Sequence, residues 1–318
     1  MPLALCASSH SPLIGLHDPA ADVVSEVHEQ LSGAKAFVEA FDPELVLVFA
    51  PDHYNGFLYD LMPSFCVGAA ATSVGDYGLP SGPLPVDRDA AYAIARHALD
   101  SGVDIALSEA MHVDHGFVQP LQFLFGSVDS IPSLVPVFVN CVAEPLGPAS
   151  RARLLGEAAG RVLGETGKRV LVVGSGGLSH DPPVPRLEGA TPEVAARITH
   201  GRNPTADQRR ERESRTVAAA GAFAAGSTDF HDLNPEWDAM VLDAFESGDI
   251  AVFDEKPNDW FTGEAGRSAH EIRTWIAAYA ALSTQGSYEM TSRYYRPIKE
   301  WFAGFAVTTA MQQKAGAR

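Results

Sequence analysis

Short apolar runs alternate with longer amphipathic stretches along the first 180 residues of the chain. The short runs are rich in Val, Leu, Ile and Phe and predict buried strands, whereas the stretches between them carry apolar residues at helical spacing. This alternation is typical of a mainly parallel sheet with helices on both faces. We expect strands at residues 3–7, 44–50, 64–68, 103–107, 134–139 and 169–173, with helices near 20–41, 87–101 and 149–165.

From about residue 192 the pattern becomes helical, and a helix near 269–283 places Ile272, Trp275 and Tyr279 on one face. The charged run at 209–215 is most simply a solvated helix face or a mobile flap. We therefore expect one domain over residues 1–318 with a three-layer α/β fold and a mainly parallel or mixed central sheet. Residues 1–190 would form the α/β core, and residues 191–318 a mainly helical portion packed on it.

Composition supports a globular protein and excludes several classes of partner. Hydrophobic residues make up 46% of 318 residues, which is enough for a full core. Forty acidic and 23 basic side chains give a formal net charge of −17, a field that repels nucleic acid and anionic membranes. A small anionic substrate would need a local cationic patch.

The location is predicted to be the cytoplasm. No apolar run approaches the roughly 18 residues of a membrane span, and the first residues show no secretory signal. Cys6, Cys66 and Cys141 form no C-x-x-C pair, so buried free thiols in a reducing compartment are expected.

Four histidines follow predicted strands. His10, His53, His115 and His180 each lie in the loop after a strand, and ligands of open α/β sheets bind outside the carboxyl ends of the strands. One such histidine would be unremarkable, but four at the same topological position favour a common pocket. Imidazole is both the commonest metal ligand and the side chain that exchanges protons near neutral pH.

A metal site would need a further ligand. Two histidines and one carboxylate leave open positions on a metal, as in non-haem Fe(II) enzymes that activate oxygen. Glu271 is the best candidate, although Ser268-x-x-Glu271 is also a capping box in which the glutamate closes back on the helix start. Asp52, Asp114 and Asp181 are competing ligands, or they orient an imidazole from the second shell.

The glycine-rich loop at 174–179 resembles a dinucleotide fingerprint only in part, because the third glycine is missing and two prolines follow at 182–183. It does not match the G-x-S-x-G turn of serine hydrolases either. We expect these glycines to let the backbone turn tightly and bring His180 close to a ligand.

Five short motifs resemble those of the class III extradiol catechol dioxygenases, the LigB-type superfamily. They are Ser-x-His-Ser-Pro with His10, Pro-Asp-His with His53, His-x-Asp-His-Gly with His115, Gly-Gly-Leu-Ser-His with His180, and Ala-His-Glu-Ile-Arg with Glu271. The resemblance runs over nearly the whole chain. It implies that His10, His53 and Glu271 hold one Fe(II), that His115 is a proton donor and that His180 is a proton acceptor.

The resemblance also implies a reaction. Fe(II) and O2 would open the ring of 3-(2,3-dihydroxyphenyl)propionate, and of 2,3-dihydroxycinnamate, without an organic cofactor. The propionate would give 2-hydroxy-6-oxo-nona-2,4-diene-1,9-dioate. A homo-oligomer, a tetramer or larger, is implied as well. Other catechols, a zinc-dependent hydrolase and a non-catalytic metal-binding relative remain alternatives, because related proteins use similar ligands for different substrates.

The implied substrate carries a carboxylate, which a cation should bind. Surface salt bridges are the simpler role for each candidate, and the sequence does not choose among Arg267, Arg273, Lys256, Arg293 and Arg296. An aromatic slot is conceivable from tyrosines, for which core packing is the simpler role, at Tyr77, Tyr294 and Tyr295.

Overall fold

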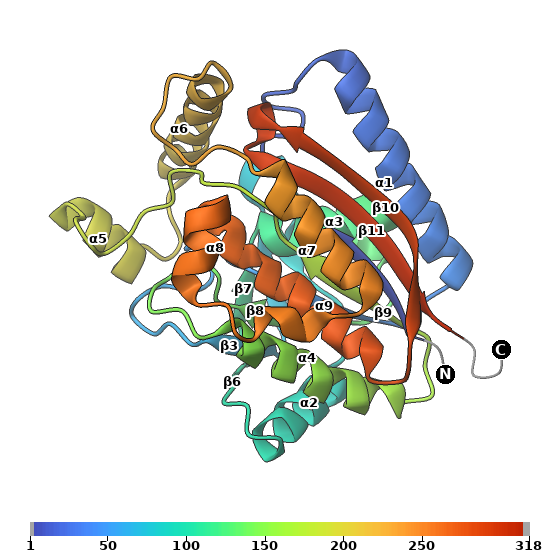
Figure 1. Ribbon diagram of the computed structural model, residues 1–318. Helices are drawn as coiled ribbons and strands as arrows, with labels where there is room; N and C mark the ends of the chain where they lie inside the picture. Colours follow the sequence, from blue (N-terminus) through green and yellow to red (C-terminus); the bar gives the residue numbers. More distant parts are fainter. Residues whose placement is uncertain (1–2, 314–318) are drawn as a thin grey trace.

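A mixed eight-stranded sheet forms the centre of the protein, with helices on both faces (Figure 1). The computed structural model describes residues 3–313. The strand order is β10-β11-β1-β9-β2-β8-β3-β6, and the inner strands β1, β9, β2 and β8 are parallel. The strands of this sheet are β1 (Leu3–Ser8), β2 (Leu45–Ala50), β3 (Phe65–Gly68), β6 (Ala106–Ser108), β8 (Leu134–Val139), β9 (Val170–Ser175), β10 (Tyr288–Ile298) and β11 (Ala303–Gln312).

Helices cover the sheet and continue beyond it. They are α1 (Ala21–Phe41), α2 (Arg88–Asp100), α3 (His115–Phe125), α4 (Ala149–Gly164), α5 (Pro192–His200), α6 (Ala206–Ala224), α7 (Pro235–Ser247), α8 (Asn258–Ala265) and α9 (Ile272–Ser283). A small second sheet has the order β5-β4-β7, from β4 (Ala71–Val74), β5 (Ser81–Pro83) and β7 (Met111–Val113). Among residues 3–313 no helix is both long and apolar enough to cross a membrane.

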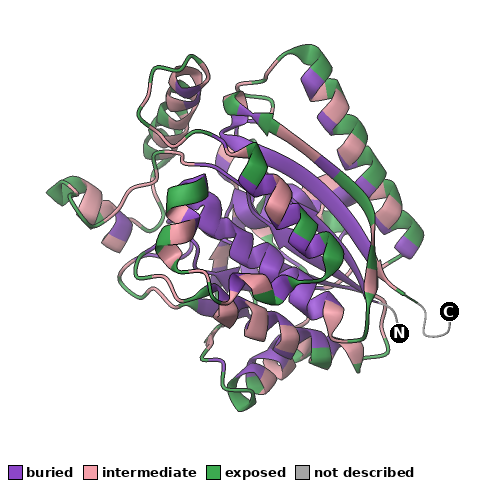
Figure 2. Ribbon diagram, viewed as in Figure 1, coloured by how far each residue is buried: buried purple, intermediate pink, exposed green. Residues whose placement is uncertain are grey.

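Strand side chains alternate between two hydrophobic cores. In β1, Leu3 and Leu5 enter the core beneath α2, α4 and α9, whereas Ala4 and Cys6 enter the core beneath α1 and α3. Both faces of the central strands are therefore buried, as Figure 2 shows by the purple sheet. This explains why the inner strands are almost continuously apolar, and it confirms the predicted three-layer α/β fold. The three cysteines are buried and free, as predicted.

The end of the chain differs from the prediction. The predicted helices near 192–283 are present, but β10 and β11 then form an antiparallel hairpin that joins the main sheet beside β1. β10 is an edge strand with several exposed residues, and β11 is rich in Ala and Thr, so neither carries a clear strand pattern. The predicted strand at 103–107 is the short edge strand β6.

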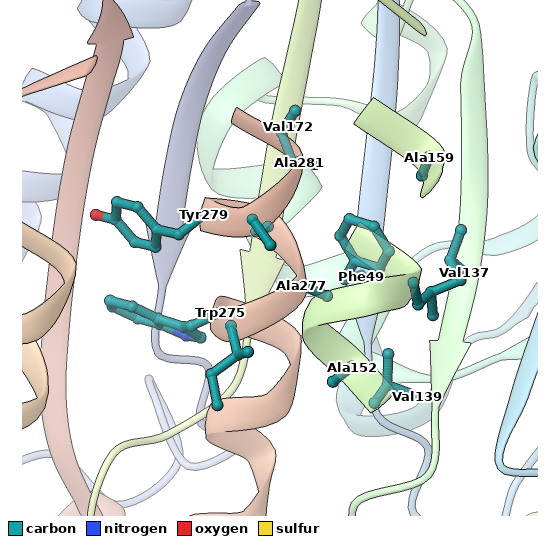
Figure 3. Packing of buried hydrophobic residues seen from close by; sticks show 14 of the residues in the cluster. Phe49, Val137, Val139, Ala152, Ala159, Val172, Trp275, Ala277, Tyr279 and Ala281 are labelled. Atoms are coloured by element: carbon teal, nitrogen blue, oxygen red, sulfur yellow. The ribbon is translucent and has the colours of Figure 1, made fainter. Parts of the chain in front are cut away.

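Close packing of α4 against α9 fixes the start of α9. A Cβ at Gly156 would lie 2.0 Å from the carbonyl oxygen of Ala277, and one at Gly160 would lie 2.3 Å from that of Ala281. Figure 3 shows α9, with Ala277 and Ala281, lying beside α4, with Ala152 and Ala159. Trp275 also donates its indole N–H to the Gly176 carbonyl, 3.1 Å away. These contacts hold the first turn of α9 beneath the loop that follows β9.

Candidate active site

Four histidines meet at the carboxyl ends of the parallel strands. His10, His180 and His53 follow β1, β9 and β2, which are neighbours in the sheet. His115 was predicted to follow a strand of the same sheet, and this is wrong, because it begins α3 after β7 of the small sheet. Its ring nevertheless stacks on that of His53, with centroids 4.4 Å apart, and lies 5.5 Å from that of His10.

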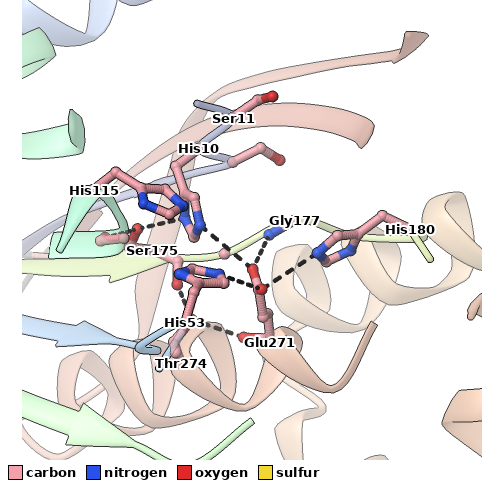
Figure 4. Close-up of polar contacts among 12 residues, drawn as sticks. His10, Ser11, His53, His115, Ser175, Gly177, His180, Glu271 and Thr274 are labelled. Atoms are coloured by element: carbon pink, nitrogen blue, oxygen red, sulfur yellow. Dashed lines mark hydrogen bonds and ion pairs between the residues drawn. The ribbon is translucent and has the colours of Figure 1, made fainter. Parts of the chain in front are cut away.

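Glu271 brings its carboxylate to the centre of these histidines (Figure 4). Oε1 lies 3.2 Å from Nε2 of His53 and 3.4 Å from Nε2 of His180, and Oε2 lies 3.8 Å from Nε2 of His10. Oε2 also accepts the backbone N–H of Gly177 at 3.0 Å. The side chain makes no capping bond at the start of α9, so the capping alternative is wrong.

Residues outside the cluster accept hydrogen bonds from the Nδ1 atoms of His10 and His53. Nδ1 of His10 lies 3.0 Å from Ser175 Oγ, which donates its own hydrogen to the Gly116 carbonyl and therefore accepts from the ring. Nδ1 of His53 lies 3.1 Å from Asp114 Oδ2. Both rings thus carry a hydrogen on Nδ1 and turn Nε2 towards Glu271, so that Nε2 is the ring nitrogen that a metal ion would bind.

The other two rings are anchored in the same way. Nδ1 of His115 lies 2.5 Å from Asp76 Oδ2, and Nδ1 of His180 lies 3.0 Å from the Leu178 carbonyl oxygen. Sequence reasoning missed Asp76, which lies in a turn after β4 and carries no motif. It also missed the role of Ser175, although this residue belongs to the glycine-rich loop.

Of Asp52, Asp114 and Asp181, only Asp114 hydrogen-bonds to a site histidine in the part of the chain that the structure describes. Asp114 accepts from both the ring and the backbone N–H of His53. Asp52 instead accepts three backbone N–H groups of residues 55–57, and Asp181 accepts two backbone N–H groups from loops of the C-terminal half. Their role is to shape loops, so the prediction that they orient an imidazole is wrong.

Glycines allow the loop after β9 to approach the cluster, as the sequence predicts. A Cβ at Gly176 would lie 2.8 Å from Cβ of Glu271, and one at Gly177 would lie 2.7 Å from Cε1 of His180. Real Cβ atoms do not approach so closely, so both positions need glycine. The loop serves the histidine cluster, which removes the need for a dinucleotide interpretation.

Charge in the cluster is set by burial and by two carboxylates. Burial lowers the pKa of His10 to about 3, so this ring is neutral at pH 7. Burial also disfavours charge on His53, but Asp114 and Glu271 outweigh it and raise its pKa well above the usual value. His180 likewise has a raised pKa, because Glu271 outweighs burial. A divalent cation would neutralise the same negative charge, so the residues fit a metal ion.

Two ligand sets are compatible with this geometry. His10 and His53 belong to both, and Glu271 or His115 is the third member. Ring nitrogens of His10, His53 and His115 lie within 4.8 Å of one another. Glu271 contacts both shared histidines and supplies the carboxylate of a two-histidine, one-carboxylate triad.

A cavity of about 370 Å³ opens from the cluster towards α5 and α6, within the usual range for a small-molecule site. At one end are the four histidines and Glu271, and Tyr77, Leu13 and Trp301 contribute to the walls. Of the tyrosines considered from the sequence, only Tyr77 lines it among the described residues. Tyr294 is buried in a core, and Tyr295 donates to Asp238.

None of the five predicted cations lines this cavity among residues 3–313. Arg273 is buried against Asn258, Arg293 and Arg296 pair with surface carboxylates, Lys256 lies over Trp260, and Arg267 lies outside the cavity. Arginines of α5 and α6 line it instead, namely Arg197, Arg209, Arg212 and Arg215. The charged run at 209–215 thus turns part of its surface to the cavity, which the sequence interpretation as a solvated face missed.

Comparisons with known proteins identify the family. Residues 4–306 match the family model described as the catalytic LigB subunit of aromatic ring-opening dioxygenase. A Rhodococcus sp protein named 2,3-dihydroxyphenylpropionate/2,3-dihydroxicinnamic acid 1,2-dioxygenase is 59% identical over 311 residues, covering 98% of this chain and 99% of that protein. A Burkholderia vietnamiensis protein of the same name is 53% identical over 318 residues, the full length of both.

Among solved structures, an uncharacterized protein from Escherichia coli K12 shares the fold. Its TM-score is 0.50 at 13% identity, covering 98% of this chain and 100% of that one. This likeness speaks for the fold alone. The family match and the full-length relatives carry the assignment: the chain belongs to the LigB family of aromatic ring-opening dioxygenases.

Proposed function

We propose that this protein is a non-haem Fe(II) extradiol dioxygenase that opens the ring of 3-(2,3-dihydroxyphenyl)propionate with O2. The product would be 2-hydroxy-6-oxo-nona-2,4-diene-1,9-dioate, which retains both oxygen atoms, and 2,3-dihydroxycinnamate would be a second substrate. The observation that carries the proposal is the meeting of His10, His53 and Glu271 beside two further histidines in one cavity. The names of the full-length relatives support the choice of substrate.

His10, His53 and Glu271 would hold the metal ion. Their donor atoms are two imidazole nitrogens and one carboxylate oxygen, a set that suits Fe(II) and leaves coordination positions free. When bound, Fe(II) would bring the catechol and O2 together and let electrons pass from one to the other. The Nδ1 partners Ser175 and Asp114 keep both rings turned towards the ion.

His180 is proposed to remove a proton from a catechol hydroxyl. Its Nδ1–H donates to the Leu178 carbonyl, so Nε2 is the nitrogen that would exchange the proton, and a metal ion bound to Glu271 would offset the negative charge that raises the pKa of this ring. The imidazolium that forms would be stabilised by Glu271 at 3.4 Å. General base help of this kind contributes roughly 10²–10⁴-fold to a rate.

His115 is proposed to deliver a proton to the oxygen that leaves the ring carbon during ring opening. Asp76 faces its Nδ1 atom and stabilises the protonated ring until Nε2 gives up its proton. Tyr77 packs its ring edge against His115 at 5.1 Å between centroids and covers this part of the cavity. Water would thereby be kept away from the proton-transfer path.

Anaerobic loading with Fe(II), followed by the catechol and air, tests the proposal. We expect one O2 to be consumed per catechol and a strongly coloured dienoate to form, with no turnover after loading with Zn²⁺. A protein that consumes no O2 with any catechol, yet hydrolyses esters or amides when loaded with zinc, would contradict the proposal.

Two further expectations stay predictions. The protein is proposed to work in the cytoplasm and to form a homo-oligomer, a tetramer or larger. Sedimentation equilibrium of the purified chain would measure the second, and cell fractionation the first. A 33.8 kDa monomer at micromolar concentration would contradict the oligomer.

A further inference from the structure

Arginines of two helices line the same cavity as the histidine cluster. Arg197 comes from α5, and Arg209, Arg212 and Arg215 come from α6 (Figure 1). Arg209, Arg212 and Thr216 follow one another at helical spacing and line the cavity, so one face of α6 is turned to it. The other side of α6 is exposed and includes Arg210.

Three of these arginines lack an anionic partner. Within residues 3–313, the guanidinium groups of Arg197, Arg209 and Arg212 make no ion pair, and Nη1 of Arg209 is buried without a hydrogen-bond partner. By contrast Arg210 pairs with Asp207 and Arg215 pairs with Glu211. Buried donors of this kind are normally satisfied, so an unpaired group in a cavity points to a missing acceptor.

Electrostatic repulsion among these arginines also points to a missing anion. Burial, together with the charges of Arg197, Arg209 and Arg215, lowers the pKa of Arg212. Burial and Arg215 likewise lower the pKa of Arg197. A local excess of positive charge in a protein of net charge −17 is costly unless an anion neutralises it.

Hydrogen bonds to Tyr77 connect helix α6 to the histidine cluster. Glu213 accepts the backbone N–H of Tyr77 at 2.8 Å, and the Tyr77 hydroxyl donates to Thr216 at 3.2 Å. The Glu213 carboxylate lines the cavity but already has this donor, whereas no carboxylate faces Arg212 within hydrogen-bond distance in the described chain. Because the ring of Tyr77 also contacts His115, the arginines occupy a defined place relative to the cluster.

We propose that Arg212, with Arg209 and Arg197, binds the side-chain carboxylate of the substrate and makes the enzyme selective for catechols with an anionic substituent. The inference rests on the proposed function, which places the catechol oxygens at the histidine end of the same cavity. The guanidinium groups offer paired N–H donors, which match the two oxygens of a carboxylate. A neutral alkyl chain would leave these donors unpaired in the cavity.

Steady-state kinetics with two substrates tests the proposal. The Fe(II)-loaded protein is compared on 3-(2,3-dihydroxyphenyl)propionate and on 3-propylcatechol, which has a chain of the same length without the carboxylate. Arg212→Gln should lower kcat/KM for the acid about 10- to 100-fold, the worth of a charge-assisted hydrogen bond, and leave 3-propylcatechol nearly unchanged. Arg210→Gln, on the exposed side of the same helix, is the matched control and should change neither.

Equal losses of Arg212→Gln on both substrates, or none on the acid, would overturn the assignment. Arg209→Gln gives the same test should Arg212→Gln fail to fold, and Arg212→Lys should restore part of the loss. Anaerobic calorimetry of the Fe(II)-loaded protein with 3-phenylpropionate and 3-phenylpropanol adds a readout without turnover. The wild-type protein should prefer the acid and Arg212→Gln should not, whereas an unchanged preference in the variant would refute the proposal.

The two proposals fail in distinguishable ways. A wild-type protein that cleaves neither catechol refutes the proposed function, while its preference for 3-phenylpropionate over the alcohol would still support the arginines. A protein that cleaves both catechols with equal kcat/KM keeps the proposed function and refutes the role of Arg212.

Discussion

Replacing Asp76 by asparagine removes the negative charge beside His115 and nearly preserves the shape of the side chain. Asp76 Oδ2 lies 2.5 Å from Nδ1 of His115, and its side chain is only 4% exposed. A hydrogen bond to a charged group is worth about 1.5–3 kcal/mol. Losing it where the protonated ring must be stabilised should lower kcat roughly 10- to 150-fold.

The thermal stability of Asp76→Asn should not fall, although its activity should. Oδ1 of Asp76 is buried and has no hydrogen-bond partner among residues 3–313, so neutralising this carboxylate relieves a poorly solvated charge. We expect an unchanged or higher Tm for Asp76→Asn by calorimetry. The loss of kcat would then come from His115 and not from unfolding.

The same variant separates the two ligand sets. Asp76 supports His115, whereas Ser175 supports His10, which belongs to both sets. Ser175→Ala should weaken iron binding about 10- to 100-fold, the usual effect of losing a partner of a ligand, while Asp76→Asn should bind iron normally. Anaerobic iron titration and O2 uptake per bound iron measure the two effects. Weakened iron binding by Asp76→Asn, with normal turnover per bound iron, would refute the reasoning and make His115 a ligand.

Three further predictions concern the metal, the proton transfers and the packing of α4. His115→Gln and His180→Gln should each retain iron but lose ring cleavage, and retained turnover by either would reject its role. Glu271→Ala should lower the iron content of the purified protein, and normal stoichiometry would move the ligand set elsewhere. Gly156→Ala, which drives a methyl group into the backbone of α9, should cost at least about 1–3 kcal/mol of unfolding free energy. Gly33→Ala, in the open middle of α1, should instead stabilise by about 0.4–1 kcal/mol; equal effects of the two glycine changes in urea denaturation would contradict the packing argument.

The pattern of apolar and polar residues predicted much of the fold, because the inner strands are apolar on both faces and the loops after them interrupt the apolar runs. That information located His10, His53 and His180 at strand ends. The sequence pattern did not predict the order of the strands, because the pairing of β1 with β9 and β11 depends on contacts between distant parts of the chain. The hairpin β10–β11 was missed because neither strand has a regular apolar alternation, since β10 is an exposed edge strand and β11 is rich in Ala and Thr.

The parts of the site that escaped prediction depend on tertiary contacts. Asp76 reaches His115 only because the small sheet brings the turn after β4 to the start of α3. The face of α6 that carries Arg209 and Arg212 has the polar pattern of a solvated helix. Periodicity distinguishes polar from apolar faces, but it cannot distinguish bulk solvent from a polar cavity.

The placement of β1 affects how the protein is made. Of the strands of this sheet β1 is synthesised first, yet its neighbours are β9 and β11, which are synthesised much later. At ~5–20 residues per second, the wait for β9 alone lasts roughly 10–30 s. During that time the apolar segment at residues 3–7 lacks both of the strands that pair with it in the folded protein, and unpaired apolar strands are prone to aggregation. Glu271 is synthesised later still, so the proposed set of His10, His53 and Glu271 could hold a metal ion only after this part of the chain has emerged.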